Sequence, residues 1–574
     1  MNALNPIYTE KRECQDCYKC IRECPVKAIR VSGGCATVST EMCILCGRCV
    51  ASCPNGAKRV RDDLPNAKSL LVSGRRVIAS VAPSFVVEFP GVRPTQLIRG
   101  LKQLGFYAVS ETALGAQQVS ANVSKLMKQE PPEVWISSAC PTVVEYIRKY
   151  HPECLPHISS LLSPVLAHCK MLRAHYGDDI GIVFIGPCIA KKIDAEQHAE
   201  LLDIVLTFED LTRWFGERNI NINDLHELPT DTFEPEEARE GALYPIEGGM
   251  IPGSVRAKGA HDSHYMSFSG LRSVSQAIEG IAEWKPEHNV FLELTACAGS
   301  CVNGPKSMRN RSIARKRYEI IRYTKAPEST SRRTPLDIRG EFEPSPIWQN
   351  GHTDMQLLDA LRSVGKTSPE DELNCGGCGY DSCRQFAHAL IDRNAERMMC
   401  ATYMRKLAQK KANALIRKMP SAVVIVDEKL KIVECNANFI RMFPAEAELG
   451  EAFPPGLEGV ALDQIVPFSY LFERVIESGE DIVGRDIRYN RNILNASIFN
   501  IDPHAVAGGI FLDITEPAFQ KEQIIERARG VVQKNLKTVQ QIAYLLGENA
   551  AESEITLNTI VQSFSPRDVE ESSD

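Results

Sequence analysis

Cysteine is the residue type whose number and spacing in this sequence point most directly to chemistry. The 574 residues include 20 cysteines, and most of them stand in short C-x-x-C clusters. Thiolates are soft ligands for iron and zinc, and clustered cysteines in a cytosolic chain bind metal far more often than they form disulfides. The spacing therefore predicts several metal sites and a reducing compartment.

The N-terminal region contains one cysteine pattern twice. Residues 14–25 read C-x2-C-x2-C-x3-C-P, and residues 43–54 repeat this order. The repeat resembles the motif of bacterial two-cluster ferredoxins, in which each run gives three thiolates to one 4Fe-4S cluster and its fourth to the other. The resemblance implies one ligand set of Cys14, Cys17, Cys20 and Cys53 and a second of Cys43, Cys46, Cys49 and Cys24. Structural zinc is the alternative, and Cys35, outside the pattern, is expected to be a loop or core thiol.

From about Arg76 the sequence alternates β-rich runs with amphipathic helices, which predicts an α/β domain with parallel strands. Cysteines follow three of the strand-like runs, in the segments SSACP (Cys140), GPCIAKK (Cys188) and ELTACAGSCVNGP (Cys297 and Cys301). Ligands bind such sheets at the loops after the carboxyl ends of the strands. Taken alone, each cysteine could be a small buried apolar residue, and Cys154 and Cys169 keep that interpretation.

Together, these three segments resemble the signature loops of the FeFe-hydrogenases, over roughly Arg76 to Lys306. The resemblance implies that Cys140, Cys188, Cys297 and Cys301 bind a 4Fe-4S cluster, and that Cys301 bridges it to a two-iron subsite with CO and cyanide ligands. This composite cofactor is the H-cluster. Lys191 matches the lysine that binds a cyanide, a charge-assisted contact, and Pro83 with Ser84 matches a segment lining the same pocket. The alternative for Lys191 is a solvated loop lysine, an interpretation that fits Lys192 better.

The chain departs from the family at positions that would carry protons. Ala139 stands where ordinary members have a proton-relaying cysteine, and alanine cannot carry a proton. The segment from Ala116 to Met127 has no Asp or Glu, although Ser159 stands at the family's relay serine. Two cluster-packing methionines are replaced by Gly186 and Thr295. These departures predict slow proton delivery with cluster binding retained, which suits a sensor better than a bulk catalyst.

A further cysteine group follows a segment rich in Arg, Pro, Ser and Thr, which indicates a linker with some local structure. Cys375, Cys378, Cys383 and Cys400 have the spacing C-x2-C-x4-C-x16-C, which resembles a small 4Fe-4S domain of redox proteins. Nearby glycines allow the backbone to approach a cluster closely. Four thiolates also suit zinc, so zinc is the alternative.

The sequence after Cys400 has no cysteine cluster and shows a different pattern of predicted strands and helices. Two β-rich runs, a charged turn and an N-x-x-F helix start near residues 421–443 resemble a PAS sensor domain, and AGGIFLDITE resembles its closing strand. Cys435 is expected to be a core thiol. A helix from about Ala518 to Phe564 carries one apolar stripe, formed by Ile525, Ala528, Val532, Leu536, Val539, Ala543 and Leu546. The stripe is either a docking face within the chain or a dimer contact with a second copy.

Bulk properties exclude several classes of function. The formal net charge is −7 and the isoelectric point is near 6.0, so nothing indicates nucleic-acid binding. The N-terminus has no apolar signal region and no segment has about 18 consecutive apolar residues. We therefore expect a cytoplasmic protein that does not bind nucleic acid or membrane.

These observations predict a multidomain α+β and α/β iron–sulfur protein that resembles the PAS-bearing, sensory branch of the FeFe-hydrogenases. The expected segments are a ferredoxin domain (1–62), an H-cluster domain (70–310), a linker (311–370), a 4Fe-4S module (371–405), a PAS domain (411–517) and a C-terminal helix and tail (518–574).

The expected reaction is slow, reversible oxidation of H2 to protons and electrons, with Lys191, Cys301 and Ser84 as the catalytic side chains. A redox partner such as ferredoxin, a downstream signalling protein and a second copy of the chain are the expected partners. The alternatives are a metabolic, ferredoxin-linked hydrogenase and a non-catalytic relative of the iron–sulfur assembly type.

Overall fold

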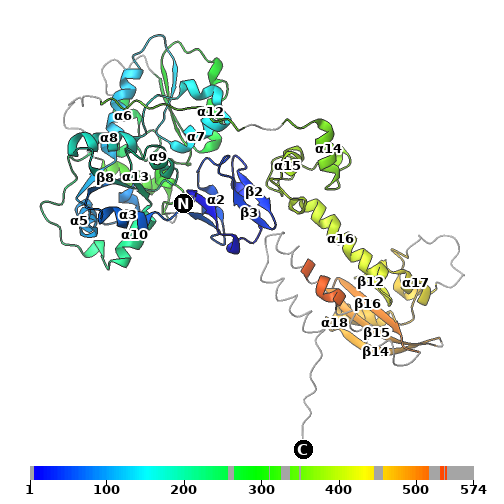
Figure 1. The fold of residues 1–574 in the computed structure, drawn as a ribbon. Coiled ribbons are helices and arrows are strands. Elements are labelled where there is room, and N and C mark those ends of the chain that lie inside the picture. Colours follow the sequence, from blue (N-terminus) through cyan, green and yellow to red (C-terminus); the bar gives the residue numbers. More distant parts are fainter. Residues whose placement is uncertain are drawn as a thin grey trace, which may run out of the picture. The chain divides into compact units, whose positions relative to one another are not determined.

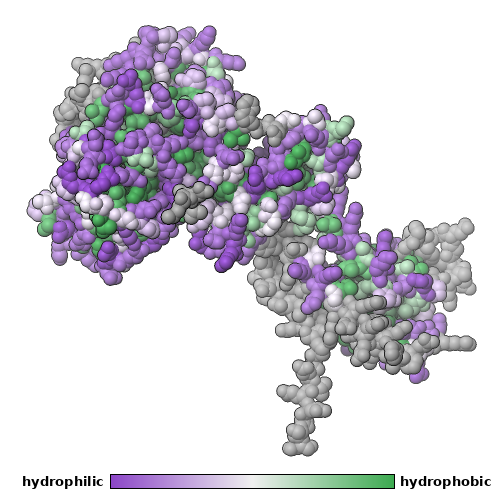
Figure 2. All heavy atoms as spheres, viewed as in Figure 1, coloured by the Kyte–Doolittle hydropathy of each residue, from purple (hydrophilic) through white to green (hydrophobic). Residues whose placement is uncertain are grey.

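The fold of the chain was analysed in a computed structural model. The structure describes residues 5–255, 264–308, 311–324, 336–347, 351–444, 457–490, 492–515, 530–535 and 537–538. It divides into two compact units, Met1–Glu396 and Arg397–Asp574 (Figure 1). Hydrophilic side chains cover most of the coloured surface of the first unit in the view of Figure 2. Within the described residues no helix is both long and apolar enough to span a membrane.

The first unit begins with a small duplicated fold. Strand β1 (Ile7–Thr9) pairs with β4 (Lys58–Val60), and β2 (Ile29–Ser32) pairs with β3 (Cys35–Val38), both antiparallel. Each cysteine run contains a five-residue helix, α1 (Lys19–Glu23) or α2 (Arg48–Ser52), whose N-cap has a positive φ and whose C-cap is a cysteine in an extended conformation. The sequence repeat is therefore also a repeat of backbone conformation.

Two parallel sheets form the core of the following domain. The first has the order β6-β5-β8-β9 and the second β10-β11-β7, which confirms the predicted parallel α/β architecture. The strands are β5 (Arg76–Val81), β6 (Ala108–Glu111), β7 (Val134–Ile136), β8 (Ile180–Ile185), β9 (Ile204–Leu206), β10 (His264–Ser269) and β11 (Val290–Thr295). All six residues of β8 and of β11 are buried, as expected for strands covered on both faces.

Helices cover both sheets of this domain (Figure 1). They are α3 (Leu64–Leu71), α4 (Phe85–Glu88), α5 (Pro94–Leu104), α6 (Ala113–Leu126), α7 (Pro141–Tyr150), α8 (Pro164–Tyr176), α9 (Lys191–Gln197), α10 (Phe208–Glu217), α11 (Ile251–Val255), α12 (Leu271–Ile278) and α13 (Ile313–Tyr323). Helices α6 and α8 approach most closely at Gly115, where an added Cβ would lie 2.1 Å from the Pro164 carbonyl oxygen. Only glycine allows this separation.

Two segments of the predicted linker pack onto this domain. Helix α13 contributes Ile320, fully buried with Val87 and Val302. Ile338 is also fully buried, and its carbonyl accepts a hydrogen bond from the Leu162 amide at 2.8 Å. The predicted linker has few apolar residues, but Ile320 and Ile338 lie in the core. The average composition of the segment does not indicate this burial.

The cysteine-rich segment that follows in the first unit contains α14 (Asp354–Arg362) and α15 (Cys383–Ile391). The two helices bury Leu357 and Leu361 against Cys383 and Ala387. Cys383 is the first residue of α15, and Cys375 and Cys378 lie in the preceding loop.

The second unit is an antiparallel sheet of order β13-β12-β16-β15-β14 preceded by α16 (Ala401–Lys418). Its elements are β12 (Ala422–Asp427), β13 (Ile432–Cys435), α17 (Ala437–Met442), α18 (Tyr470–Ser478), β14 (Ile482–Tyr489), β15 (Asn492–Asp502) and β16 (Val506–Asp513). The two predicted strands, the helix start and the closing strand are confirmed. The predicted C-terminal stripe lies, apart from Val532, outside the described residues.

Replacing Gly115 by alanine is predicted to destabilise the first unit by about 1–3 kcal/mol, since the new methyl group meets backbone that cannot move without separating two helices. The midpoint of thermal unfolding should fall accordingly. Gly216 in α10 is the matched control, because an added Cβ there has no neighbour within 4 Å. Gly216→Ala should be neutral or stabilising, and equal midpoints for the two variants would contradict the packing argument.

Candidate metal centres

Three loops place the predicted H-cluster cysteines at the carboxyl ends of parallel strands. Cys140 follows β7 and is the N-cap of α7, with Pro141 as the first helical residue. Proline suits that position because its missing N–H would have no helical partner. Cys188 lies between β8 and α9, and Cys297 and Cys301 follow β11. The predicted placement of these loops is confirmed.

The four thiols of these loops lie within electrostatic range of one another. Burial raises the pKa of Cys188 to about 11, and nearby Cys140 raises it further. Burial likewise raises the pKa of Cys301 to about 12, with additional contributions from Cys188 and Cys140. The pKa of Cys297 is raised by burial and by all three of the others. Buried thiolates in such a group require positive charge among them, which the irons of a cluster supply.

Buried hydroxyl groups next to these loops fit a larger cofactor. The side-chain oxygens of Ser84, Thr295 and Ser300 are buried and make no hydrogen bond to any described residue. Such orphaned hydroxyls are costly in a dry interior. Cluster sulfides or anionic ligands would accept hydrogen bonds from them, so the residues present fit the H-cluster that the sequence predicts.

Lys191 points toward the same place. Its ammonium lies 2.8 Å from Asp194 Oδ2 and 3.5 Å from the carbonyl oxygen of Ala139. Its charge lowers the pKa of both Cys188 and Cys301. Lys191 is therefore a buried cation beside the cysteine group, held by an ion pair on its own helix, and the solvated alternative is wrong for it.

The interpretation of Lys192 as a solvated loop lysine is wrong. Its side chain is fully buried, and its ammonium lies 2.6 Å from Asp63 Oδ2 and 2.8 Å from the Val205 carbonyl oxygen. Asp63 follows the ferredoxin-like fold and also binds Arg61. A Lys-Lys pair on a helix start looks exposed in sequence, but a carboxylate from a distant segment neutralises the second lysine.

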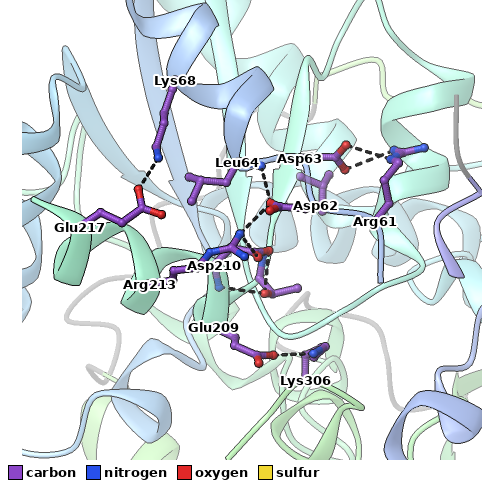
Figure 3. A network of polar contacts seen from close by, with 12 residues as sticks. Arg61, Asp62, Asp63, Leu64, Lys68, Glu209, Asp210, Arg213, Glu217 and Lys306 are labelled. Atoms are coloured by element: carbon purple, nitrogen blue, oxygen red, sulfur yellow. Dashed lines mark hydrogen bonds and ion pairs between the residues drawn. The ribbon is translucent and has the colours of Figure 1, made fainter. Parts of the chain in front are cut away.

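The polar network around Asp63 continues along the join between the two folds (Figure 3). Arg213 donates to Asp62 at 2.7 Å, and Lys68 pairs with Glu217. In the same view Glu209 pairs with Lys306, the residue directly after the third cysteine segment. These contacts fix the third loop and the ferredoxin exit to one helix, α10.

The family's proton-relay positions contain no complete path in this structure. Ser159 is buried, and its hydroxyl lies 3.2 Å from Ser138 Oγ, whose own proton is donated to the Leu161 carbonyl. Helix α6 carries the buried amides Gln117 and Gln118 in place of carboxylates. The described side chains at these positions make local bonds that hold the first loop in place.

One titratable side chain at this site was missed by the sequence analysis. Glu293 lies on β11, whose other residues carry no charge, and is fully buried. Its Oε2 accepts a hydrogen bond from the Met250 amide at 3.2 Å, but its Oε1 has no partner among the described residues. Burial raises the pKa of Glu293 to about 7, and its charge reaches Cys301. A lone glutamate inside a strand otherwise free of charge was the available signal.

The ferredoxin-like cysteines form two groups. Beside buried Cys20 lie the charges of Cys14, Cys17 and Cys53. Beside Cys49 lie Cys24, Cys43 and Cys46, and Cys20 of the other group makes a smaller contribution to its pKa. The predicted ligand sets, with the exchange of the fourth cysteine between runs, stay a prediction. Cys35, expected to be a loop or core thiol, begins β3 and contacts Cys14.

Backbone amides donate hydrogen bonds to several of these sulfurs. They run to Cys14 from Ala36 (3.5 Å), to Cys24 from Ala28 (3.3 Å) and to Cys43 from Leu45 (3.4 Å). Such bonds stabilise thiolates and tune cluster potentials. Cys46 of the second group is also among the charges that raise the pKa of Cys297, so the second ferredoxin group adjoins the H-cluster cysteines.

The last predicted site has three of its cysteines in the first unit. Cys375 is exposed and Cys383 buried. Cys400 belongs to the second unit, where it is the N-cap of α16, so the four-cysteine set stays a prediction. Within the described residues, no three Cys, His, Asp or Glu side chains are placed to hold one metal ion. This finding concerns mononuclear sites, whereas a cubane takes its four thiolates on four separate irons.

Comparisons with known proteins agree with this geometry. Residues 75–305 match the family described as iron only hydrogenase large subunit, C-terminal domain. Residues 36–59 match a 4Fe-4S binding domain, and residues 371–402 match the FeS family of Fe-S cluster segments. The chain therefore contains an FeFe-hydrogenase-like domain together with iron–sulfur segments.

Individual relatives cover part of the chain. Iron hydrogenase 1 of Clostridium pasteurianum is 24% identical over 321 residues, which are 46% of this chain and 55% of that protein. Protein NAR1 of Arabidopsis thaliana is 25% identical over 280 residues, 41% of this chain and 57% of that protein. A solved apo FeFe-hydrogenase from Chlamydomonas reinhardtii has a TM-score of 0.41 at 19% identity, covering 50% of this chain and all of that one. The chain thus spans little more than half the length of these two curated relatives.

Replacing Glu293 by glutamine is predicted to remove a pH dependence of stability. Because the pKa of Glu293 is raised from 4.5 to about 7, the folded state binds more protons than the unfolded state between these values, and stability falls as pH rises through that window. The loss approaches roughly 3 kcal/mol above pH 7, at about 1.4 kcal/mol per unit. Thermal unfolding from pH 4.5 to 8 should show a smaller decline for Glu293→Gln, whereas parallel curves would contradict the assignment.

Proposed function

We propose that the protein is a slow FeFe-hydrogenase that oxidises H2 reversibly and uses this reaction to sense hydrogen or redox state. The observation that carries the proposal is the convergence of Cys140, Cys188, Cys297 and Cys301 from three loops beside the buried ammonium of Lys191. When bound, the H-cluster would supply the cleavage of dihydrogen. The remaining steps concern the side chains of the chain itself.

The ligand and pocket roles are assigned as the sequence predicts. The four cysteines hold the cluster, with Cys301 as the bridge to the two-iron subsite. Lys191 offers a charge-assisted hydrogen bond to an anionic ligand, while Asp194 and the Ala139 carbonyl orient its ammonium. Ser84, beside Pro83, has a free buried hydroxyl to donate into the pocket.

Slow turnover is expected because the site has few side chains that could deliver protons. Ala139 has no acidic proton, and α6 offers no carboxylate. The charge of buried Glu293 reaches Cys301, and this carboxyl can hold a proton on its unpartnered oxygen near neutral pH. A site that binds the cofactor but moves protons poorly is suited to occupancy-dependent signalling more than to bulk gas turnover.

The proposed output is the second unit, which we interpret as a PAS domain. Cys400 caps α16, and the far end of α16 is tied to the sheet by buried Asn436. The Asn436 amide donates to the carbonyls of Ile416 and Ser421, and its oxygen accepts the Val423 and Phe439 amides. A change at Cys400 therefore has a helix through which to reach the sheet of the same unit. A partner protein, and a second copy of the chain, are the proposed recipients.

The alternative is a non-catalytic iron–sulfur protein, and the similarity to NAR1, of which several relatives are named cytosolic Fe-S cluster assembly factor, favours considering it. Such a protein would hold clusters without a two-iron subsite. A metabolic hydrogenase is a further alternative, which the altered proton positions disfavour.

Cys188→Ser is predicted to abolish the infrared bands of CO and cyanide ligands after maturation, because one corner of the cluster loses its thiolate. The two ferredoxin clusters should remain reducible. Cys154→Ala is the control, since this buried thiol lies outside the ligand sets. If the wild type itself showed no such bands after maturation, the assembly-type alternative would replace the hydrogenase proposal.

Ala139→Cys is predicted to speed dye-coupled H2 oxidation. A proton relay contributes about 10²–10⁴-fold to a transfer step, and the gain should fall well short of that range because no carboxylate on α6 continues the path. Rates should be compared across pH with both proteins fully loaded. A wild type as fast as metabolic enzymes would refute the sensor proposal, and an unchanged variant rate would show that proton delivery does not limit turnover.

A further inference from the structure

The accessory cysteine segment packs against the ferredoxin-like fold within the first unit. The Val31 amide donates to the Asn394 carbonyl at 3.0 Å, and the Gly33 amide donates to Glu396 Oε1 at 2.7 Å. Arg30 Nε donates to the Asn394 side chain at 3.1 Å. The end of the segment is therefore bound by backbone and side-chain contacts to the β2–β3 hairpin.

The loop between two accessory cysteines lies directly on α1. Gly379 has φ +92°, and a Cβ added there would lie 2.8 Å from Ile21 Cγ2 and 3.3 Å from the Arg22 amide nitrogen. The Arg22 guanidinium also reaches the Gly377 carbonyl at 3.5 Å. Helix α1 begins one residue before Cys20 and ends at Cys24, so this contact joins the loop after Cys378 to the predicted ferredoxin ligands.

Tyr380 occupies the space between the two sets of cysteines. Its side chain is buried, and its hydroxyl has no hydrogen-bond partner among the described residues. Tyr380 lies two residues after Cys378 and directly after Gly379, which contacts Ile21 on α1. An orphaned donor between two cysteine groups fits a site where a cluster sulfur accepts the hydrogen bond.

We infer that the accessory cluster exchanges electrons with the ferredoxin cluster of Cys24, Cys43, Cys46 and Cys49, and that this ferredoxin cluster is a junction between it and the H-cluster. The junction adjoins the H-cluster loops at Gly47, where an added Cβ would lie 2.5 Å from Pro305 Cβ and 2.8 Å from Ile189 Cδ1. It adjoins the accessory cysteine loop where Gly379 meets Ile21 on α1. The inference rests on the proposed function for the source of electrons, but its geometry stands on the first unit alone.

The electron count closes within the chain. Oxidation of one H2 breaks one bond and releases two protons and two electrons. Each 4Fe-4S cluster is reduced from the 2+ to the 1+ state by one electron, so the junction and the accessory cluster together can accept both. The accessory cluster would then report hydrogen oxidation at the position in the sequence that immediately precedes α16.

The test uses the full chain with its 4Fe-4S clusters loaded and the two-iron subsite left out, reduced by dithionite. Electron paramagnetic resonance should show magnetic coupling between the accessory and ferredoxin clusters, because the dipolar interaction between spins falls steeply with distance. Cys378→Ala should lose the accessory cluster and with it that part of the coupling. A wild-type spectrum equal to the variant spectrum plus one isolated cluster would overturn the inference.

Two glycine substitutions give a second test that does not depend on correct folding of Cys378→Ala. Gly379→Ala forces a methyl group against Ile21 and should weaken the coupling while the iron content is unchanged. Gly365→Ala is the matched control, because Gly365 lies outside the cysteine loop and also has positive φ, +71°, with no neighbour within 4 Å of an added Cβ. Equal coupling in wild type and Gly379→Ala would count against the contact as the route.

The hydroxyl of Tyr380 gives an independent measurement. Tyr380→Phe should move the midpoint potential of the junction or the accessory cluster to a more negative value, since a hydrogen bond to sulfur stabilises the reduced state. Exposed Tyr318 on α13 supplies the control Tyr318→Phe. Unchanged potentials in Tyr380→Phe would refute the placement of this hydroxyl. None of these measurements needs hydrogen, so a negative result would not contradict the proposed function. Missing CO and cyanide bands would likewise not contradict the proposed electron transfer between the accessory and ferredoxin clusters.

Discussion

The burial of thiol groups beside one another is the constraint on which the first unit depends. Cys20, Cys49, Cys188 and Cys301 each have a pKa raised by desolvation and by neighbouring cysteines, so ionised sulfurs there are unfavourable without compensating positive charge. Clusters supply it, and binding free energy then becomes folding free energy. The parallel sheets, the capped helix starts and the positive-φ residues all serve to aim sulfurs at common points.

Much of the placement of the cysteines could be predicted from the sequence, because it depends on the spacing of residues close together in the chain. The duplicated runs indicate the repeated helix that ends before Cys24 and before Cys53, and the Cys-Pro step at Cys140 marks a helix start after a strand. What could not be predicted depends on distant partners. Lys192 looks exposed until Asp63 is known to reach it, and Ile338 looks like linker until it lies beside Leu162. Pairings between segments more than a hundred residues apart leave no periodic signal.

The residues concerned with protons also include one feature that the sequence predicts and one that it does not. The absence of a proton-relay side chain at Ala139 can be predicted from the sequence, because the residue type alone decides whether the side chain can carry a proton. The position of Glu293 cannot, since a glutamate in a strand is usually on an exposed face. Its burial, with one oxygen unpartnered, follows from β11 being covered on both faces. Stability and proton storage at this site therefore oppose each other, because the same desolvation that raises the pKa of Glu293 destabilises its charged form.

The predicted accessory cysteines divide between the two units. In the first unit the loop after Cys378 packs on α1, and in the second unit Cys400 caps α16, whose other end is held by Asn436. A cluster ligated by Cys400 would gain negative charge on reduction at the start of α16, where the positive end of the helix dipole stabilises negative charge. The charge state of the cluster would then change the stability of that helix start. A redox event would thereby reach the sheet through helix order, without a separate ligand.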